Sequence, residues 1–225
     1  MKKITVLLAE DHNIVREGFR SLLKHERDIE VVGEAETGRE AVQLTRKLRP
    51  AVVVMDMAMP LLNGLEATRQ IRKDFPDIRV LILSAHSDDA YVEQMTELGA
   101  AGFLLKQTSS HVLATAIREV QKGNTYFSPS IAKRFHGRDQ KSPARRGLLK
   151  KRINRLSSRE MEVLQLIAEG QANKQVAAEL GVSFKTIDKH RQHLMAKLNI
   201  HDTAGLTRYA ISAGIIESSV QVTII

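Results

Sequence analysis

The sequence contains no cysteine and no long apolar run. Without cysteine the chain cannot form a disulfide, a thiolate zinc site or a cysteine nucleophile. No apolar run reaches the roughly 18–20 residues that a membrane-spanning helix needs. The first residues, Met1-Lys2-Lys3, lead into a strand-like pattern and not into a cleavable signal sequence. We therefore expect a cytoplasmic protein with no membrane partner.

Acidic residues are scarce in the second half of the 225-residue chain. Residues 1–128 contain 17 Lys and Arg against 18 Asp and Glu, whereas residues 129–225 contain 17 against 8. The excess lies in 129–155, which holds ten basic residues and one acid. A basic half is typical of a nucleic-acid-binding protein, with basic residues that only aid solubility as the alternative.

Short apolar runs alternate with longer amphipathic stretches over residues 1–122. The runs predict strands at 4–9, 29–33, 51–56, 79–84 and 101–105. The stretches predict helices at 13–25, 38–48, 64–74, 89–98 and 110–122. Strands and helices in alternation predict an α/β domain in which helices cover both faces of a parallel sheet.

The pattern changes after residue 122, where 123–129 is expected to form a turn and exit. We predict a first domain over 1–124, a basic linker over 125–153, an all-α domain over 154–217 and a tail over 218–225. In the all-α domain a first helix should begin near Ser157 and end at Gly170. Three further helices are expected at about 173–180, 183–198 and 203–212.

Charged or hydroxyl residues stand at the ends of four predicted strands. Glu10 and Asp11 follow the first strand, and Asp56 ends the third. Ser84 ends the fourth, and Lys106 follows the fifth. Alone, each has a simpler explanation, since a carboxylate at a strand end is often a cap and a lysine is usually solvated. Because the carboxyl ends of parallel strands form one edge of a sheet, we expect the five to meet there.

Such a set of groups suits phosphoryl transfer to a carboxylate. Three neighbouring carboxylates repel one another unless they hold a cation or stay partly protonated. Oxygen ligands without cysteine or a histidine cluster favour Mg²⁺. The lysine would supply a second positive charge, and the hydroxyl would bind a phosphoryl oxygen.

These residues lie in motifs that resemble the receiver domain of bacterial two-component response regulators, a flavodoxin-like doubly wound (βα)5 fold. The motifs are Ala9-Glu10-Asp11-His12, Met55-Asp56-Met57-Ala58-Met59-Pro60 with Gly64, Ser84-Ala85 and Gly102-Phe103-Leu104-Leu105-Lys106. Three positions depart from the common pattern of the family: Glu10 where many receivers have Asp, Ser84 where Thr is commoner, and Gln107 where many have Pro.

The resemblance implies that Asp56 accepts a phosphoryl group from a cognate histidine kinase. It also implies a Mg²⁺ site formed by Asp11, Asp56 and the main-chain carbonyl of Ala58, with Glu10 acting mostly through water. Ser84 and Lys106 would hold the phosphoryl group, and Phe103 would be the switch aromatic.

Residues 173–192 have the spacing of a helix-turn-helix. Ala177 is small where the two helices would cross, and Gly181 falls in the turn, where glycine accepts a left-handed backbone. On the next helix the outer face carries polar side chains, namely Lys185, Asp188, Lys189 and Gln192. This face is expected to enter the major groove of DNA, with a plain solvated helix surface as the alternative.

This second domain resembles the LuxR-type module of the NarL/FixJ group, through Leu156-Ser-Ser-Arg159-Glu160, Asn173-Lys174, Lys185-Thr186-Ile187 with His190, and Leu194 with Lys197-Leu198. The resemblance implies DNA-backbone contacts from Lys174, Lys185, Thr186 and Lys197. It implies base contacts from Asp188, Lys189 and Gln192, although an acid at 188 is a departure. The helix over 203–212 would be the dimer surface on DNA.

The features together predict a DNA-binding transcription regulator controlled by phosphorylation, not an enzyme, which forms a homodimer when phosphorylated or bound to promoter DNA in the nucleoid. One alternative is a Mg²⁺-dependent phosphohydrolase of the haloacid-dehalogenase type. That type needs a second Asp two residues after the nucleophile, where this sequence has Ala58. Another is a receiver that only binds proteins. We also hypothesise that the basic linker contacts DNA phosphates, with a merely soluble linker as the alternative.

Overall fold

The computed structural model describes residues 3–85, 92, 95–107, 109–129, 131–132 and 156–216. The chain forms two compact units, Met1–Pro143 and Ala144–Ile225. Of the helix expected over 89–98 the structure describes 92 and 95–98, and of these 92 and 95–97 are helical. The tail over 218–225 and most of the basic linker fall outside the described residues. Within the described part, no helix combines the length and apolar character needed to cross a membrane.

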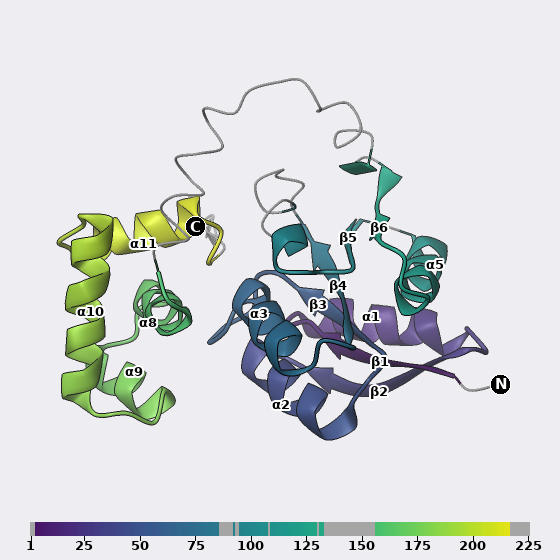
Figure 1. Ribbon diagram of the computed structural model, residues 1–225, viewed down its shortest axis with the longest axis horizontal. Coiled ribbons are helices and arrows are strands. Elements are labelled where there is room, and N and C mark those ends of the chain that lie inside the picture. Colours follow the sequence, from purple (N-terminus) through teal and green to yellow (C-terminus); the bar gives the residue numbers. More distant parts are fainter. Residues whose placement is uncertain are drawn as a thin grey trace, which may run out of the picture. The chain divides into compact units, whose positions relative to one another are not determined.

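The first unit is built on a parallel sheet in the order β2-β1-β3-β4-β5-β6 (Figure 1). The strands are β1 (Ile4–Ala9), β2 (Ile29–Ala35), β3 (Val52–Asp56), β4 (Arg79–Ser84), β5 (Gly102–Leu105) and β6 (Tyr126–Phe127). The described helices are α1 (Asn13–Lys24), α2 (Gly38–Leu48), α3 (Gly64–Asp74) and α5 (Ser110–Gln121). The parallel α/β fold expected from the alternating pattern is confirmed.

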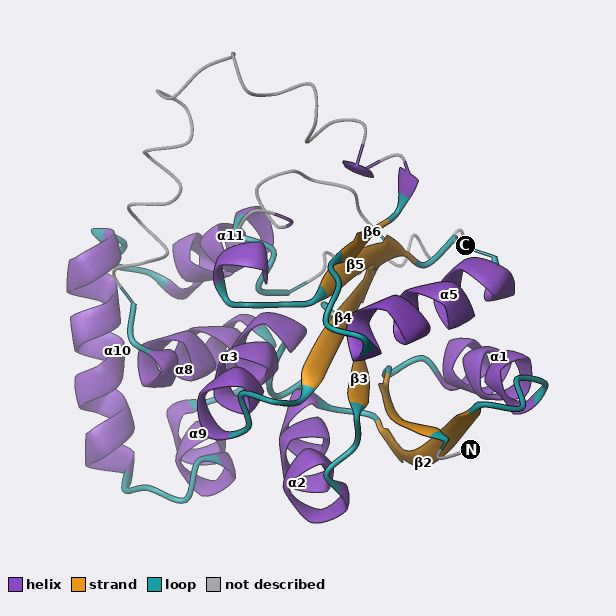
Figure 2. Ribbon diagram, turned by 45° about the vertical axis from the view of Figure 1, so that its right-hand side comes forward, coloured by secondary structure: helices purple, strands orange, loops and turns teal. Residues whose placement is uncertain are grey.

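Helices cover both faces of this sheet, with α1 and α5 on one side and α2 and α3 on the other (Figure 2). Successive side chains of a strand point to opposite faces. Leu7 of β1 therefore packs in one buried cluster with Ile71 of α3. Its neighbour Leu8 packs in the other, with Leu23 of α1. A strand buried on both faces needs apolar residues throughout, which explains the continuous run of β3.

A sixth strand corrects the expectation that 123–129 forms only a turn and exit. Tyr126 and Phe127 of β6 pair in parallel with Gly102 and Phe103 of β5. The two strands approach closely at Gly102, where an added Cβ would lie 2.4 Å from the Tyr126 carbonyl oxygen. A strand of two residues has no periodicity that a sequence pattern could reveal.

The second unit contains α8 (Ser158–Ala168), α9 (Asn173–Glu179), α10 (Phe184–Leu198) and α11 (Thr203–Ser212). Side chains cap three helix starts, because Ser157, Ser183 and Asp202 each accept a hydrogen bond from the backbone three residues later. Helix α8 packs against the other three. Gly181 has φ of 63° in the turn before α10, and Val182 N–H donates to the Ala177 carbonyl at 3.0 Å. The predicted all-helical domain is confirmed.

Candidate functional site

Two buried carboxylates and a lysine meet at the carboxyl edge of the sheet. Glu10 directly follows β1 and is 2% exposed, and Asp56 ends β3 and is 1% exposed. Lys106, directly after β5, places Nζ 2.9 Å from Glu10 Oε2 and 3.0 Å from Asp56 Oδ2. Three strands that are far apart in the sequence thus bring one positive and two negative charges together.

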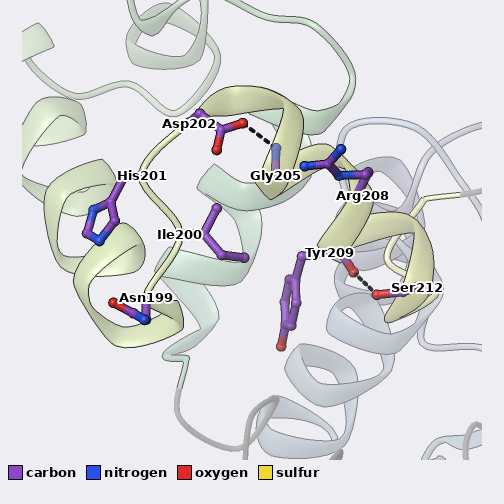
Figure 3. A pocket seen from close by; sticks show the side chains of 8 residues that line it. All are labelled: Asn199, Ile200, His201, Asp202, Gly205, Arg208, Tyr209 and Ser212. Atoms are coloured by element: carbon purple, nitrogen blue, oxygen red, sulfur yellow. Dashed lines mark hydrogen bonds between the residues drawn. The ribbon is translucent and has the colours of Figure 1, made fainter.

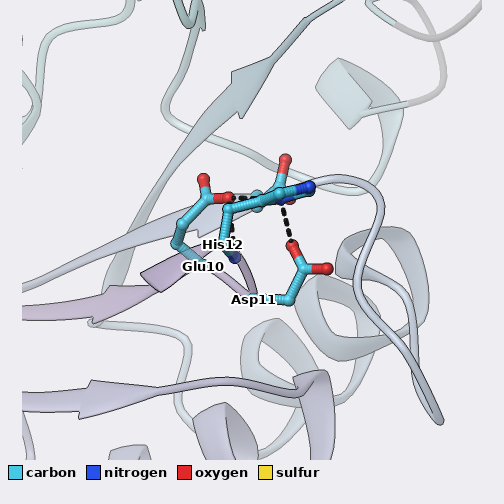
Figure 4. Close-up of side chains that lie close together, drawn as sticks. Glu10, Asp11 and His12 are labelled. Carbon is cyan, nitrogen blue, oxygen red and sulfur yellow. Dashed lines mark hydrogen bonds and ion pairs between the residues drawn. The ribbon is translucent and has the colours of Figure 1, made fainter. Parts of the chain in front are cut away.

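Asp11 and His12 complete an acidic cluster around this point (Figure 4). His12 Nδ1 lies 2.9 Å from Asp11 Oδ1 and 3.1 Å from Glu10 Oε1. The negative charge of Asp11 raises the pKa of His12, and this effect is larger than the opposing effect of burial. Ligand atoms of Glu10, Asp11, His12 and Asp56 all lie within 4.8 Å of one another.

The carboxylates of this cluster fit a hard divalent cation. Glu10 Oε2 and Asp56 Oδ2 are buried oxygens that share one cation, Lys106 Nζ, and the buried Asp11 Oδ1 is paired with His12 Nδ1. Two buried carboxylates that share one ammonium group are incompletely neutralised, and coordination to a cation would reduce that cost. Oxygen donors in this number are what Mg²⁺ takes from proteins, together with water.

Burial and the negative charge of Glu10 favour the uncharged form of Asp56. Burial, followed by the nearby charge of Glu10, raises the pKa of Asp56 to about 7, although Lys106 acts in the opposite direction. Burial lowers the pKa of Lys106, but the charges and hydrogen bonds of Asp56 and Glu10 outweigh it, so this pKa lies above its usual value. The lysine is therefore a permanent cation beside a carboxyl group that ionises near neutral pH.

The loop after β3 is held close to the Asp56 backbone. Gly64 N–H donates to the Met57 carbonyl at 2.8 Å. A Cβ at Gly64 would lie 2.0 Å from the Asp56 carbonyl oxygen, so only glycine fits. Ala58, whose carbonyl was predicted to bind the metal, lies half-buried in this loop.

Ser84 and Phe103 lie on the two strands beyond β3. Ser84 ends β4 and is 4% exposed, and its carbonyl accepts a hydrogen bond from Lys106 N–H at 2.8 Å. The predicted phosphoryl ligands Ser84 and Lys106 thus lie on adjacent strand ends. Phe103 is 1% exposed and belongs to the same buried cluster as Ile82 and Ile131. In this structure the predicted switch aromatic is an interior side chain.

Arg16 is a buried residue near the site that the sequence interpretation missed. It lies on α1, is 6% exposed and donates from Nη1 to the Glu10 carbonyl at 2.7 Å. Its other nitrogens contact Glu34 at 3.3 Å and Glu36 at 2.6 Å. The sequence did carry a signal, because an arginine at position 16 falls on the inner side of α1, seven residues before the buried Leu23.

In the second unit, α10 separates a buried side from a polar side. Ile187, Leu194 and Leu198 are buried, and they hold the helix against the rest of the unit. The residues predicted to contact DNA, one on α9 and the others on α10, are all exposed or half-buried. They are Lys174, Lys185, Thr186, Asp188, Lys189, Gln192 and Lys197. Gln192 Nε2 donates to Asp188 Oδ2 at 3.0 Å, so two of the predicted base readers are joined.

Lys197 has a structural partner that its sequence position did not reveal. Its Nζ lies 2.7 Å from Oε2 of Glu160, a buried residue of α8. The same oxygen accepts a hydrogen bond from Ser157 N–H at 2.8 Å. Burial opposes ionisation of Glu160, but the bonds from Lys197 and Ser157 outweigh it and lower the pKa of Glu160. Lys197 therefore joins the end of α10 to the start of α8.

An open hollow lies at the corner between α10 and α11 (Figure 3). The turn residues His201 and Asp202 and the α11 residues Arg208 and Tyr209 contribute to its lining. Asp202 Oδ1 accepts the Gly205 N–H at 2.7 Å, which fixes the start of α11. The hollow adjoins the helix that was predicted as the dimer surface.

Two family models match the two units. Residues 6–118 match the response regulator receiver domain. Residues 154–210 match the bacterial regulatory proteins of the luxR family.

Relatives align over nearly the whole chain. The transcriptional regulatory protein DegU of Brevibacillus brevis is 35% identical over 89% of this chain and 89% of DegU. The response regulator protein VraR of Staphylococcus aureus is 35% identical over 95% of this chain and 99% of VraR. A structure of the RcsB response regulator of Salmonella typhimurium is 28% identical over 95% of this chain and 99% of that chain, with a TM-score of 0.61. An RcsB–DNA complex is 29% identical over 94% of this chain and 99% of that chain, with a TM-score of 0.56.

Proposed function

Because this chain belongs to the two-component response regulators with a LuxR-type domain, and acts as a DNA-binding transcription regulator, we propose that phosphorylation of Asp56 controls its binding to promoter DNA. A regulator of this family is not an enzyme, so the phosphohydrolase alternative is set aside. The observation that carries the proposal is the position of Lys106, with its ammonium group between the buried carboxylates of Glu10 and Asp56.

In the proposed reaction Asp56 is the acceptor and a phosphohistidine of the cognate kinase is the donor. An Asp56 oxygen forms a bond to phosphorus while the phosphorus–nitrogen bond of the donor breaks, and the histidine leaves with a proton from solvent. Lys106 stays protonated and offsets negative charge on the phosphoryl oxygens. Ser84, on the adjacent strand end, would donate its hydroxyl hydrogen to one of those oxygens.

Glu10, Asp11, Asp56 and the main-chain carbonyl of Ala58 would hold Mg²⁺. Bound there, the ion supplies positive charge that neutralises the phosphoryl oxygens. The buried carboxylates of Glu10 and Asp56, which share one ammonium group, support this assignment, since a cation would neutralise them further. Arg16 keeps the Glu10 backbone in place through its bond to the carbonyl oxygen.

Phosphorylation changes a charge at Asp56 and must bias two conformations of the first unit. We propose that Ser84 moves towards the phosphoryl group and that Phe103, buried here, changes its rotamer in response. The surface that changes would belong to α5 and to the helix expected over 89–98. The output is a change in dimerisation and DNA affinity.

In the second unit, α10 would enter the major groove. Asp188, Lys189 and Gln192 would contact base edges, while Lys174, Lys185, Thr186 and Lys197 would contact the DNA backbone. Helix α11 would form the dimer surface. We propose that the receiver extends beyond the expected bound of 124, because β6 and the buried Ile131 belong to its sheet and core. We further propose a DNA-binding domain over 154–217 and a cytoplasmic location.

The test is phosphorylation in vitro with a small acyl-phosphate donor. With Mg²⁺ present, intact-mass analysis should show one added phosphoryl group on the wild type and none on Asp56→Asn. Chelation of Mg²⁺ should abolish the adduct. Lys106→Met should slow its formation while Lys122→Met, which removes an exposed lysine of the same unit, should not. An adduct of equal yield on Asp56→Asn would refute the assignment.

A further inference from the structure

Phe184 is a large apolar side chain exposed to solvent on α10. It is the first residue of that helix and is 57% exposed. Among the residues that the structure describes, the other exposed large apolar side chains are Ile14, Leu22 and Ile211, and none of them lies on α10. Because isolated apolar residues are common on protein surfaces, the position of Phe184 must carry the argument.

The start of α10 fixes where Phe184 lies. Ser183 caps the helix, since its Oγ accepts from Thr186 N–H at 3.1 Å and lies 2.8 Å from Thr186 Oγ1. Residues four apart are neighbours on a helix surface, so Phe184 is adjacent to Asp188, which in turn bonds to Gln192. Phe184 thus begins the row 184, 188 and 192, whose other two members are proposed base readers.

We infer that Phe184 contacts the C5 methyl group of a thymine in the major groove. This inference rests on the proposal that α10 is the recognition helix. The N-terminal residues of a recognition helix are those that reach base edges. A phenyl ring neither donates nor accepts a hydrogen bond, and the apolar group that the major groove offers is the thymine methyl. Phe184 is therefore a specificity-determining residue that selects for thymine by excluding water from its methyl group.

Uracil substitution tests the contact, because it removes only the methyl group. The probe is a DNA duplex selected by the wild-type protein from a random pool, and affinity is measured by fluorescence anisotropy at fixed salt. Replacing the contacted thymine by uracil should weaken wild-type binding about fourfold, the value of one buried methyl group. Phe184→Ala should bind the unmodified duplex roughly tenfold more weakly and should not respond to that uracil. Phe184→Leu should retain part of the response.

Two controls separate this contact from other effects. Leu22→Ala removes a similarly exposed apolar side chain, 40% exposed on α1, and should respond to every uracil as the wild type does. Because Phe184 is exposed, Phe184→Ala should keep the wild-type circular dichroism melt. The inference is overturned if Phe184→Ala shows the wild-type uracil response at every thymine.

Variants on the same face distinguish this inference from its premise. If Lys189→Ala and Gln192→Ala change the base preference while Phe184→Ala does not, the inference alone fails. If none of the three changes any base preference, α10 is not the recognition helix and the inference falls with the proposal on which it rests. A uracil response that is lost in Phe184→Ala but kept in Lys189→Ala and Gln192→Ala supports both.

Discussion

Asp56 in the first unit and Glu160 in the second are buried to nearly the same extent, 1% and 4% exposed, yet their pKa values move in opposite directions. Burial and Glu10 raise the pKa of Asp56 to about 7. Burial also opposes ionisation of Glu160, but bonds from Lys197 and Ser157 overcome it and lower its pKa. Exposed area alone therefore does not decide whether a carboxylate ionises easily, because the charged and hydrogen-bonding partners of each group also act on its pKa.

The partners of the two carboxylates explain their different roles. Glu160 Oε2 accepts from Ser157 N–H and lies 2.7 Å from Lys197 Nζ, so its charge is satisfied and stabilises the fold. Asp56 Oδ2 is buried and shares the ammonium group of Lys106 with Glu10. A carboxylate left short of partners costs stability but remains available to an incoming cation or phosphoryl group. We therefore regard Asp56 as reactive and Glu160 as structural.

The largest expected effect is a stabilisation on removing the Asp56 charge. An acid whose pKa rises on folding costs stability above the pKa of the unfolded state, and the cost grows until the pH reaches the folded-state pKa. For Asp56 that range runs from 3.8 to about 7. Without Mg²⁺, Asp56→Asn should raise the free energy of unfolding by about 2–4 kcal/mol at pH 8 and hardly at all at pH 4. Urea denaturation with a chelator present measures this, and added Mg²⁺ should narrow the difference. If Asp56→Asn is less stable than the wild type at pH 8, the ionised Asp56 does not cost stability and the contrast with Glu160 fails.

Glu160→Gln should have the opposite sign. A lowered pKa in the folded state means that the carboxylate stabilises the fold above its unfolded-state pKa of about 4.5, and that this stability is lost as acid protonates the folded group. The variant should lose about 1–3 kcal/mol at neutral pH and much less near pH 3. In a double-mutant cycle with Lys197→Met the two losses should not add. If the losses in free energy of unfolding add, and if the loss in Glu160→Gln is the same at neutral pH and near pH 3, the charge of Glu160 does not stabilise the fold through Lys197.

Arg16→Met tests how the first site is supported. The variant leaves the Glu10 carbonyl and the carboxylate of Glu36 without their donor, which should cost about 1–2 kcal/mol of stability and slow phosphorylation of Asp56. Arg16→Lys should restore part of the rate. Arg20→Met is the matched control, because Arg20 contacts Glu34 from a side chain that is 55% exposed. If the two Met variants behave alike in urea denaturation and in the rate of the mass adduct, Arg16 has no special part in the site.

The smallest effect is expected at an ion pair that is only partly buried. Arg118 contacts Asp28 at 2.6 Å and also pairs with Glu26, and its hydrogen bonds lower the pKa of Asp28. Asp28 is 44% exposed, so water screens the pair and Asp28→Asn should cost below about 1 kcal/mol. The small cost should be present above pH 4 and lost on acidification, as measured by urea denaturation. If Asp28→Asn costs as much stability as Glu160→Gln, burial does not determine how much an ion pair stabilises this protein.

The sequence predicted those parts of the fold that depend on periodicity. Continuous apolar runs such as that of β3 and the alternation of runs and amphipathic stretches identified the sheet and its helices. Strand β6 was missed, because its two residues are held by pairing with Gly102 and Phe103 and not by a pattern of their own.

Part of the candidate site could likewise be predicted from the sequence and part could not. The meeting of Glu10, Asp56 and Lys106 follows from their positions at strand ends. That Glu10 and Asp56 share a single lysine does not follow, since it depends on side-chain geometry. Lys197 was interpreted only as a DNA contact because its partner Glu160 lies 37 residues earlier on another helix. The exposure of Phe184 could not be predicted, because a phenylalanine in a helix is ordinarily expected to be buried.

The central claim is that a phosphoryl group on Asp56 controls DNA affinity. Its most direct test is a fluorescence-anisotropy titration of a selected promoter duplex with the wild type and with Asp56→Asn. Each protein is measured in Mg²⁺ with and without an acyl-phosphate donor. We predict that the donor tightens binding of the wild type about tenfold or more and leaves Asp56→Asn unchanged, a coupling of at least about 1.4 kcal/mol. Equal affinities for the two proteins under both conditions would contradict the claim.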